Sequence, residues 1–109
     1  MSADNSCNFT GRLTREPDLK YTQQGTAVCT IDLAVYAYYS KKDDEEKTVF
    51  PRMKMYGERA ENIAKNLDKG QMVSINAEYR CDTDGQKYYP YFLIKDIRFK
   101  TKAKKQGRG

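Results

Sequence analysis

The chain has 109 residues, with nine tyrosines, four phenylalanines, no histidine and no tryptophan, and its formal net charge is +5. A chain of this length forms one domain with a modest core. The lack of histidine excludes sites built on imidazole, and three widely spaced cysteines (Cys7, Cys29 and Cys81) argue against a zinc site or a disulfide framework and favour a reducing compartment.

The positive charge is concentrated at the C-terminal end. Residues 100–109 contain no acid and five cations, Lys100, Lys102, Lys104, Lys105 and Arg108. Residues 1–99 therefore balance 15 basic against 15 acidic side chains. No apolar run could span a membrane, and residues 1–10 lack a secretion pattern. We expect a cytoplasmic protein with a flexible N-terminus (residues 1–5), one folded domain (residues 6–99) and a basic, disordered tail (residues 100–109).

The N-terminal part predicts two strands. Residues 7–13 alternate, with Cys7, Phe9, Gly11 and Leu13 on one face. Turn signals around Pro17 and at residues 23–25 flank a short segment, 19–21. The longest candidate strand covers residues 27–39, where the apolar set is Ala27, Cys29, Ile31, Leu33 and Val35. Such a long strand is expected to bend near its far end, which carries Tyr36, Tyr38 and Tyr39. Residues 40–47 predict a charged loop.

Residues 48–69 carry the clearest pattern in the chain. One face of the predicted strand is apolar and is expected in the core: Val49, Pro51, Met53 and Met55. The other face alternates ring, cation, cation and ring: Phe50, Arg52, Lys54 and Tyr56. Such a face suits base stacking and phosphate contact. After Gly57, a stripe of Ala60, Ile63, Ala64 and Leu67 predicts a helix that continues to Lys69 and stops at Gly70.

Two more strands complete the domain. Residues 72–81 alternate, with Val73, Ile75, Ala77, Tyr79 and Cys81 expected inward. A hairpin signal at residues 82–85 leads to a return strand over residues 87–99, in which Pro90 indicates an edge or a bulge. Five strands with one short helix between the third and the fourth form the element order of an all-β OB-fold, a five-stranded Greek-key barrel. The order alone leaves SH3-like barrels and other small β domains open, and the position of the helix favours the OB-fold.

Three segments carry a resemblance to a known family. Residues 11–28 (GRLTREPDLKYTQQGTAV) resemble the opening signature of the bacterial single-stranded DNA-binding protein family: Gly-x-Leu, an acidic-Pro-acidic turn, a basic-Tyr pair and Gly-x-Ala-Val. Residues 50–70 resemble its third strand, helix and Lys-Gly exit, and residues 91–99 resemble its last strand. The resemblance covers residues 6–99. It implies an OB-fold that forms homo-oligomers and coats single-stranded DNA without sequence preference in replication, recombination and repair, with no cofactor and no enzyme activity.

The resemblance also implies roles for individual residues. Tyr39, Phe50 and Tyr56 match the stacking aromatics of the family. Its basic positions along the DNA are matched by Lys20, Arg52, Lys69 and Arg80, and Lys54 shares the face of Arg52. The family also carries a stacking aromatic on the outgoing arm of the last hairpin. This chain lacks it, and Tyr88 and Tyr89 on the returning arm are expected to replace it.

The sequence departs from the family at both ends. The first strand is more polar than the usual Val/Ile-rich strand that helps to build the dimer, so the choice between dimer and tetramer stays open. The family's acidic, Phe-terminated tip, which recruits partner proteins, is replaced by a basic ending. We therefore expect no binding to repair enzymes that recognise such a tip, whereas contacts with replication proteins stay open. We interpret the chain as a divergent phage or plasmid member or as a tail-truncated form.

Other interpretations compete with DNA coating. The acidic run at residues 43–46 could suggest a metal-dependent nuclease, but adjacent residues in a loop rarely converge on one ion. A replication-assembly adaptor of the same fold, which binds a helicase or its loader rather than DNA, is the main alternative function. Tyr36 and Tyr38 fit packing or a subunit contact as well as DNA contact. The basic tail is either a solvated end or a non-specific grip on phosphates.

Overall fold

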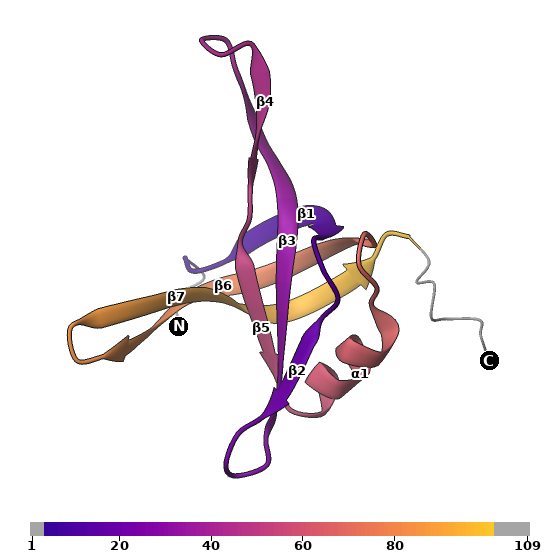
Figure 1. Cartoon of the computed structure of the whole chain (residues 1–109), viewed down its shortest axis with the longest axis vertical. Coiled ribbons are helices and arrows are strands. Elements are labelled where there is room, and N and C mark those ends of the chain that lie inside the picture. The colour runs from indigo at the N-terminus through magenta and orange to yellow at the C-terminus, as the bar shows by residue number, and fades with distance from the viewer. Residues whose placement is uncertain (1–3, 102–109) are drawn as a thin grey trace.

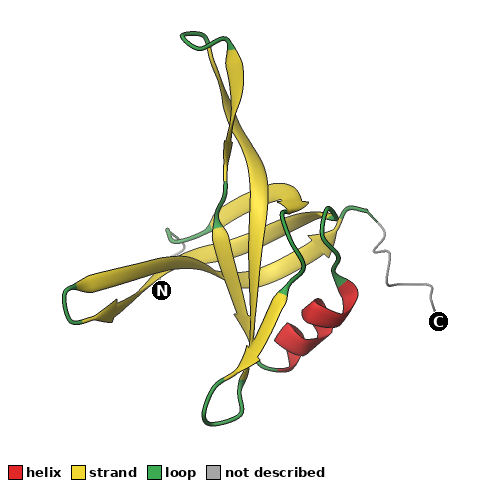
Figure 2. Ribbon diagram, in the orientation of Figure 1, coloured by secondary structure: helices red, strands yellow, loops and turns green. Residues whose placement is uncertain are grey.

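The computed structural model describes residues 4–101, which form seven strands and one short helix (Figure 1, Figure 2). The strands are β1 (Cys7–Leu13), β2 (Asp18–Tyr21), β3 (Ala27–Ser40), β4 (Glu45–Val49), β5 (Arg52–Tyr56), β6 (Met72–Asp84) and β7 (Lys87–Phe99). The helix α1 (Glu58–Asn66) lies between β5 and β6.

Five of these strands close into a barrel. The order β1-β6-β7-β5-β3 returns to β1, because β1 also pairs with β3 through Arg12↔Ala34 and Leu13↔Leu33. The β5–β7 contact is parallel and the other pairings are antiparallel. The remaining strands, β2 and β4, pair with β3 only. The predicted OB-fold barrel, with one helix between its third and fourth strands, is confirmed.

The core follows the alternation of the sequence. The fully buried side chains are Cys29, Ile31, Leu33, Met53, Leu67, Val73 and Ile75. Ala60 and Ile63 of α1 also belong to this cluster, so the helix covers one end of the barrel. Burying a side chain of leucine size stabilises the fold by about 1.5–3 kcal/mol.

Closure of the barrel depends on a glycine in β1. A Cβ atom added at Gly11 would lie 2.3 Å from the carbonyl oxygen of Ala34 and 2.9 Å from Val35 Cγ2. Since the first neighbour is backbone, a rotamer change cannot relieve the clash. A residue without a side chain is therefore needed where β1 approaches β3.

Two hairpin arms project from the barrel (Figure 1). We call them the β3–β4 arm (residues 36–49) and the β6–β7 arm (residues 79–90). The first has a register shift between Tyr36 and Tyr38, which confirms the expected bend in β3. The second continues its ladder as far as Asp84↔Lys87. Pro90 pairs with Cys81 of β6, and the pairing of β7 with β5 involves Phe92 and Leu93. At Pro90, β7 is therefore paired on one side, which confirms the expected edge position.

The arms correct several sequence-based expectations. Only residues 41–44 form the expected charged loop, because the ladder with β3 continues through Glu45 and makes β4 a strand. Val49, expected in the core, is 43% exposed because it belongs to the arm. Tyr79 and Cys81 are exposed for the same reason, although their neighbours in β6 alternate correctly.

The helix is shorter than the sequence predicts. It ends at Asn66, and Leu67 is extended (φ −108°, ψ 143°) while its N–H still bonds to the Ile63 carbonyl. Lys69 and Gly70 follow in a turn, with φ +86° at Gly70. Leu67, the last residue of the predicted apolar stripe, is therefore buried although it follows the helix, and Lys69 lies outside the helix.

Both ends of the described chain are held to the barrel. The Asn5 side chain donates to the Tyr79 carbonyl (3.0 Å) and accepts from the Tyr79 N–H (2.8 Å), so this residue of the expected flexible N-terminus is tied to β6 by its side chain. The N–H groups of Lys100 and Thr101 donate to the Met72 carbonyl. Residues 102–109, most of the predicted basic tail, lie outside the described residues.

Candidate nucleic-acid interface

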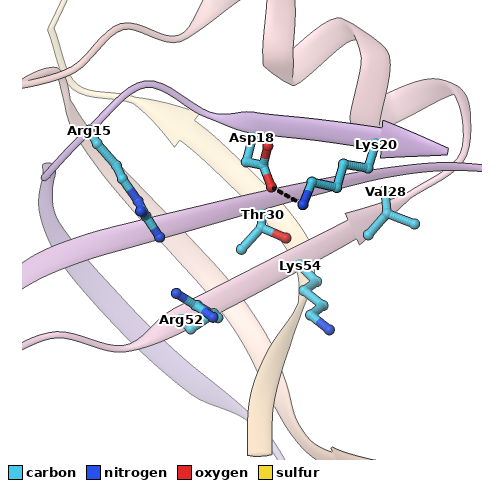
Figure 3. A pocket seen from close by; sticks show the side chains of 7 residues that line it. All are labelled: Arg15, Asp18, Lys20, Val28, Thr30, Arg52 and Lys54. Carbon is cyan, nitrogen blue, oxygen red and sulfur yellow. Dashed lines mark ion pairs between the residues drawn. The ribbon is translucent and has the colours of Figure 1, made fainter. Parts of the chain in front are cut away.

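The outer faces of β2, β3 and β5 form a polar hollow of about 480 Å³, opposite the core. Its lining is Arg15, Asp18, Lys20, Val28, Thr30, Arg52 and Lys54, and we call it the cationic hollow (Figure 3). The register Lys20↔Val28 and Thr30↔Lys54 places these side chains on one face. The short hairpin between β2 and β3 thus places Lys20 on the same face as Arg52 and Lys54. The alternation within β5 predicts this face only for residues of β5 itself.

A second hollow, of about 360 Å³, opens beside the first. It is lined by Arg52, Lys54, Asp82, Tyr88, Tyr89, Pro90 and Tyr91, and we call it the tyrosine hollow. Because Arg52 and Lys54 line both hollows, the two form one continuous groove. The groove runs from four cations on the barrel to three tyrosines on and beside the β6–β7 arm.

Asp32 organises the arginines of the cationic hollow. Its Oδ1 accepts from Arg52 Nε at 3.0 Å and its Oδ2 accepts from Arg15 Nε at 2.9 Å. Burial alone raises the pKa of Asp32, but the hydrogen bonds and charges of Arg52 and Arg15 outweigh it and lower this pKa below its ordinary value. The carboxylate is therefore ionised at neutral pH, and the three side chains together carry one net positive charge.

Lys54 and Tyr56 are coupled to Tyr91. Lys54 Nζ lies 4.7 Å from the centroid of the Tyr91 ring, a cation–π contact, and this ring is almost fully buried. The pKa of Tyr56 is raised by burial, with smaller contributions from Tyr91 and Asp82. Lys54 therefore packs on the Tyr91 ring at the junction of the two hollows, and Tyr56 lies two residues further along the same face of β5.

The structure brings five of the ten sequence-predicted site residues into the groove: Lys20, Arg52, Lys54, Tyr88 and Tyr89. Tyr56 ends the same face of β5. Phe50 lies just before β5 and is 65% exposed, and Tyr88 is 70% exposed, so both rings are open to a ligand. These seven residues carry the aromatic and basic chemistry that the sequence predicts.

Three predicted site residues lie away from this lining. Tyr39 is on the β3–β4 arm, and its hydroxyl donates to Asp44, which raises the pKa of Tyr39. The Arg80 guanidinium forms an ion pair with Glu78. Arg80 lies opposite Tyr91 of β7, so it is on the face of the sheet that carries the tyrosine hollow. The backbone of Lys69 is bonded to Glu16 at 3.0 Å in the turn after α1, outside both linings.

Sequence reasoning missed two residues of the groove, Arg15 and Tyr91, and also Asp32, which holds two of its arginines. Arg15 lies just before the turn at Pro17. The position of Asp32 opposite Arg52 follows only from the β3–β5 register. Tyr91 alternates with Tyr89 along β7, and this period of two could have indicated that both lie on one face.

Within residues 4–101, no helix is long and apolar enough to cross a membrane. The same residues contain no group of three or more cysteines or acids that could hold a metal ion. The acids at the tip of the β3–β4 arm instead pair with a nearby lysine, since Lys47 Nζ lies 2.9 Å from Asp43 and 2.7 Å from Glu45.

Comparison with known proteins supports the resemblance. The sequence profile described as "Single-strand binding protein family" matches residues 4–99. Single-stranded DNA-binding protein 2 of Listeria monocytogenes is 35% identical over 83 residues, which cover 72% of this chain and 52% of that protein. The single-stranded DNA-binding protein of Oceanobacillus iheyensis is 32% identical over 104 residues, covering 90% of this chain and 65% of that protein.

The fold comparison agrees with the sequence comparison. The crystal structure of the wild-type single-stranded DNA binding protein from Thermus aquaticus has a TM-score of 0.75 at 23% identity and covers 87% of this chain and 49% of that chain. This chain thus spans about half the length of the Listeria and Thermus proteins. From the profile match over residues 4–99, the chain belongs to the single-strand binding protein family.

Proposed function

We propose that this chain binds single-stranded DNA without base preference, in replication, recombination or repair. The observation that carries the proposal is the continuous groove, in which Arg52 and Lys54 line both the cationic and the tyrosine hollow. A single strand offers phosphates and base faces in alternation, and cations beside rings match both. Family membership and the names of the relatives support the same ligand.

The proposed roles follow from the chemistry of each side chain. Bases stack on exposed rings, for which the candidates are Tyr39, Phe50, Tyr56, Tyr88 and Tyr89. Phosphates contact the cations of the groove, Lys20, Arg52 and Lys54, and a longer strand reaches Arg80 and Lys69. Stacking is tolerant of sequence because every base has a π-face, so binding without base preference is expected.

The assembly is part of the proposal. A groove of this size on one barrel contacts a short stretch of a strand, and coating of a long strand needs several barrels. We propose a homo-oligomer, a dimer or a tetramer, in the cytoplasm. The basic residues after Lys100 add a charge-dependent grip on the same strand.

Titration with oligo-dT of increasing length tests the function. Tyrosine fluorescence should be quenched on binding, since rings that stack on bases lose emission, and light scattering on the same samples gives the mass of the complex. We expect quenching to saturate at fewer strands per protein molecule as the oligonucleotide lengthens, because a longer strand holds more barrels. The absence of quenching and of a mass change at every length would contradict DNA binding and favour the adaptor function instead.

A further inference from the structure

Asp32 is an acid that holds two of the four cations of the cationic hollow, Arg15 and Arg52. It lies on β3 directly opposite Arg52 on β5, and its side chain is only 15% exposed. The side chains of Arg15 and Arg52 that it holds are 62% and 54% exposed. A single carboxylate therefore occupies donors of two guanidinium groups whose outer edges face the solvent.

The backbone of Asp32 also fixes the approach of Arg15. The Asp32 carbonyl accepts from the Thr14 N–H at 2.9 Å and from Thr14 Oγ1 at 3.2 Å. These two bonds anchor the chain one residue before Arg15, so its side chain reaches over β3 toward Arg52 (Figure 3). Both arginines are thus pre-positioned around one point of the groove.

A carboxylate and a phosphate use guanidinium donors in the same way. Both accept in pairs from the planar fork of arginine. The donors that Asp32 occupies are the ones that a phosphate in the cationic hollow would take. Resting on the proposed function, we propose that Asp32 is an internal competitor of the DNA phosphate, which positions Arg15 and Arg52 and limits the affinity of the groove.

The size of the effect follows from counterion release. Each phosphate contact to a single strand contributes a salt slope of roughly 0.7. If removal of the Asp32 charge frees one further contact, affinity should rise about eightfold at 0.05 M salt and about twofold at 0.3 M salt. If Asp32 competes with phosphate, removal of its charge should raise the affinity for DNA, and this gain should shrink as the salt concentration rises. If Asp32 only positions Arg15 and Arg52, its removal should lower the affinity.

The variant Asp32→Asn tests the proposal, because it removes the charge and keeps an acceptor of similar shape. Asp96→Asn is the matched control, since Asp96 pairs with Arg98 at 3.5 Å and lies outside the lining of both hollows. We expect Asp32→Asn to bind labelled oligo-dT about eightfold more tightly at low salt, with a slope steeper by about 0.7. Asp96→Asn should gain less than about twofold, through the change in net charge alone.

A double-mutant comparison locates the source of the gain. In a background with Arg15→Gln and Arg52→Gln, no guanidinium remains for Asp32 to release, so Asp32→Asn should give no gain beyond that of Asp96→Asn. Circular dichroism on each variant verifies that the barrel is folded before its affinity is compared.

The unmodified protein offers an independent test if a variant does not fold. In its NMR spectrum the Nε–H signals of Arg15 and Arg52 should shift when oligo-dT is added, because phosphate replaces their carboxylate partner. Arg59, whose Nη1 donates to the Lys95 carbonyl at 3.3 Å, serves as the internal control and should not shift. Arg15 and Arg52 signals that stay unchanged at saturation would overturn the proposal.

The possible failures are distinguishable. If the parent protein does not bind oligo-dT, both the proposed function and this inference are wrong. If the parent binds but Asp32→Asn gains no more than Asp96→Asn, or binds more weakly than the parent, the competitor role is wrong and the proposed function stands.

Discussion

The strands β3 and β6 each contain two regions with opposite burial. In the barrel, residues 27–35 and 73–77 alternate between buried and half-buried side chains. In the arms, residues 36–39 and 79–84 are exposed on both faces. The backbone is a paired strand in both regions. The difference is that in the barrel another part of the sheet covers the inner face, and in the arms nothing in the described chain does.

This contrast separates two uses of the same residue types. Rings and aliphatic side chains in the barrel stabilise the fold by burial. The large apolar side chains in the arms stay 43–70% exposed, and this surface becomes useful only when a ligand covers it. We therefore expect barrel substitutions to change stability and arm substitutions to change binding.

The largest expected effect is on the barrel side. Leu33 is fully buried, and Leu33→Ala should reduce the free energy of unfolding by about 2–5 kcal/mol, measured by denaturant titration, because it leaves a cavity. Tyr38→Ala, on the exposed half of the same strand, is the control and should cost less than about 0.5 kcal/mol. Equal losses in the two variants would erase the distinction between barrel and arm.

Ring removal tests the exposed rings on the β6–β7 arm and at Phe50, which directly follows the β3–β4 arm. Phe50→Ala and Tyr88→Ala should each weaken oligo-dT binding by about 1–3 kcal/mol, the usual value of a base-aromatic stack, with little change in stability. Tyr21→Ala is the matched control. Tyr21 is 56% exposed but donates to Glu61 on α1 at 2.7 Å, on the face of β2 opposite Lys20. A loss in Tyr21→Ala as large as in the other two would place the DNA elsewhere.

The tail gives a smaller effect. Deletion of residues 102–109 should leave the unfolding free energy unchanged and weaken DNA binding at low salt, with the difference vanishing as salt screens the charges. Deletion of residues 100–109 should also destabilise the barrel, since it removes the bonds of Lys100 and Thr101 to Met72. Salt titration measures the DNA affinity of both deletion variants, and denaturant unfolding measures their stability. Identical stability of the two deletions would contradict this role of residues 100–101.

The smallest effect is the pH dependence from Asp32, which lies on the barrel half of β3 but points to the groove. Its folded pKa is lowered, so its contribution to stability is complete above the unfolded carboxyl pKa of about 3.9 and is lost as pH falls through the lower folded value. The unfolding free energies of the parent and Asp32→Asn should therefore differ constantly near neutral pH and converge below about pH 4. If the difference in unfolding free energy between the two proteins instead grew as the pH fell, the pKa of Asp32 would be raised in the folded protein and not lowered.

The barrel could be predicted from the sequence because burial enforces a period. The set Ala27, Cys29, Ile31, Leu33 and Val35 is buried as predicted, and the helix lies where its apolar stripe indicates. The same reasoning failed in the arms at Val49, Tyr79 and Cys81. The alternation of these residues continues that of the barrel, but in the arms the inner face is uncovered. An alternation with a period of two residues does not show where the layer that covers a strand ends.

The groove could be predicted only in part. Arg52 and Lys54 follow from the pattern of one strand, and Tyr88 and Tyr89 from the family comparison. The pairing of Asp32 with Arg15 and Arg52 depends on the β3–β5 register and on the position of the turn after β1. These are relations between distant segments, and the local periodicity of one chain does not contain them.

Binding of an abasic strand tests the central claim most directly. An abasic oligonucleotide of the same length has the phosphates of oligo-dT and no bases, so the two ligands differ only in stacking. By competition against labelled oligo-dT at one salt concentration, we expect the abasic strand to bind at least about tenfold more weakly, since each lost stack costs roughly 1–3 kcal/mol. Equal affinity of the two strands would show that charge alone holds the DNA and that the exposed rings of the arms do not bind bases.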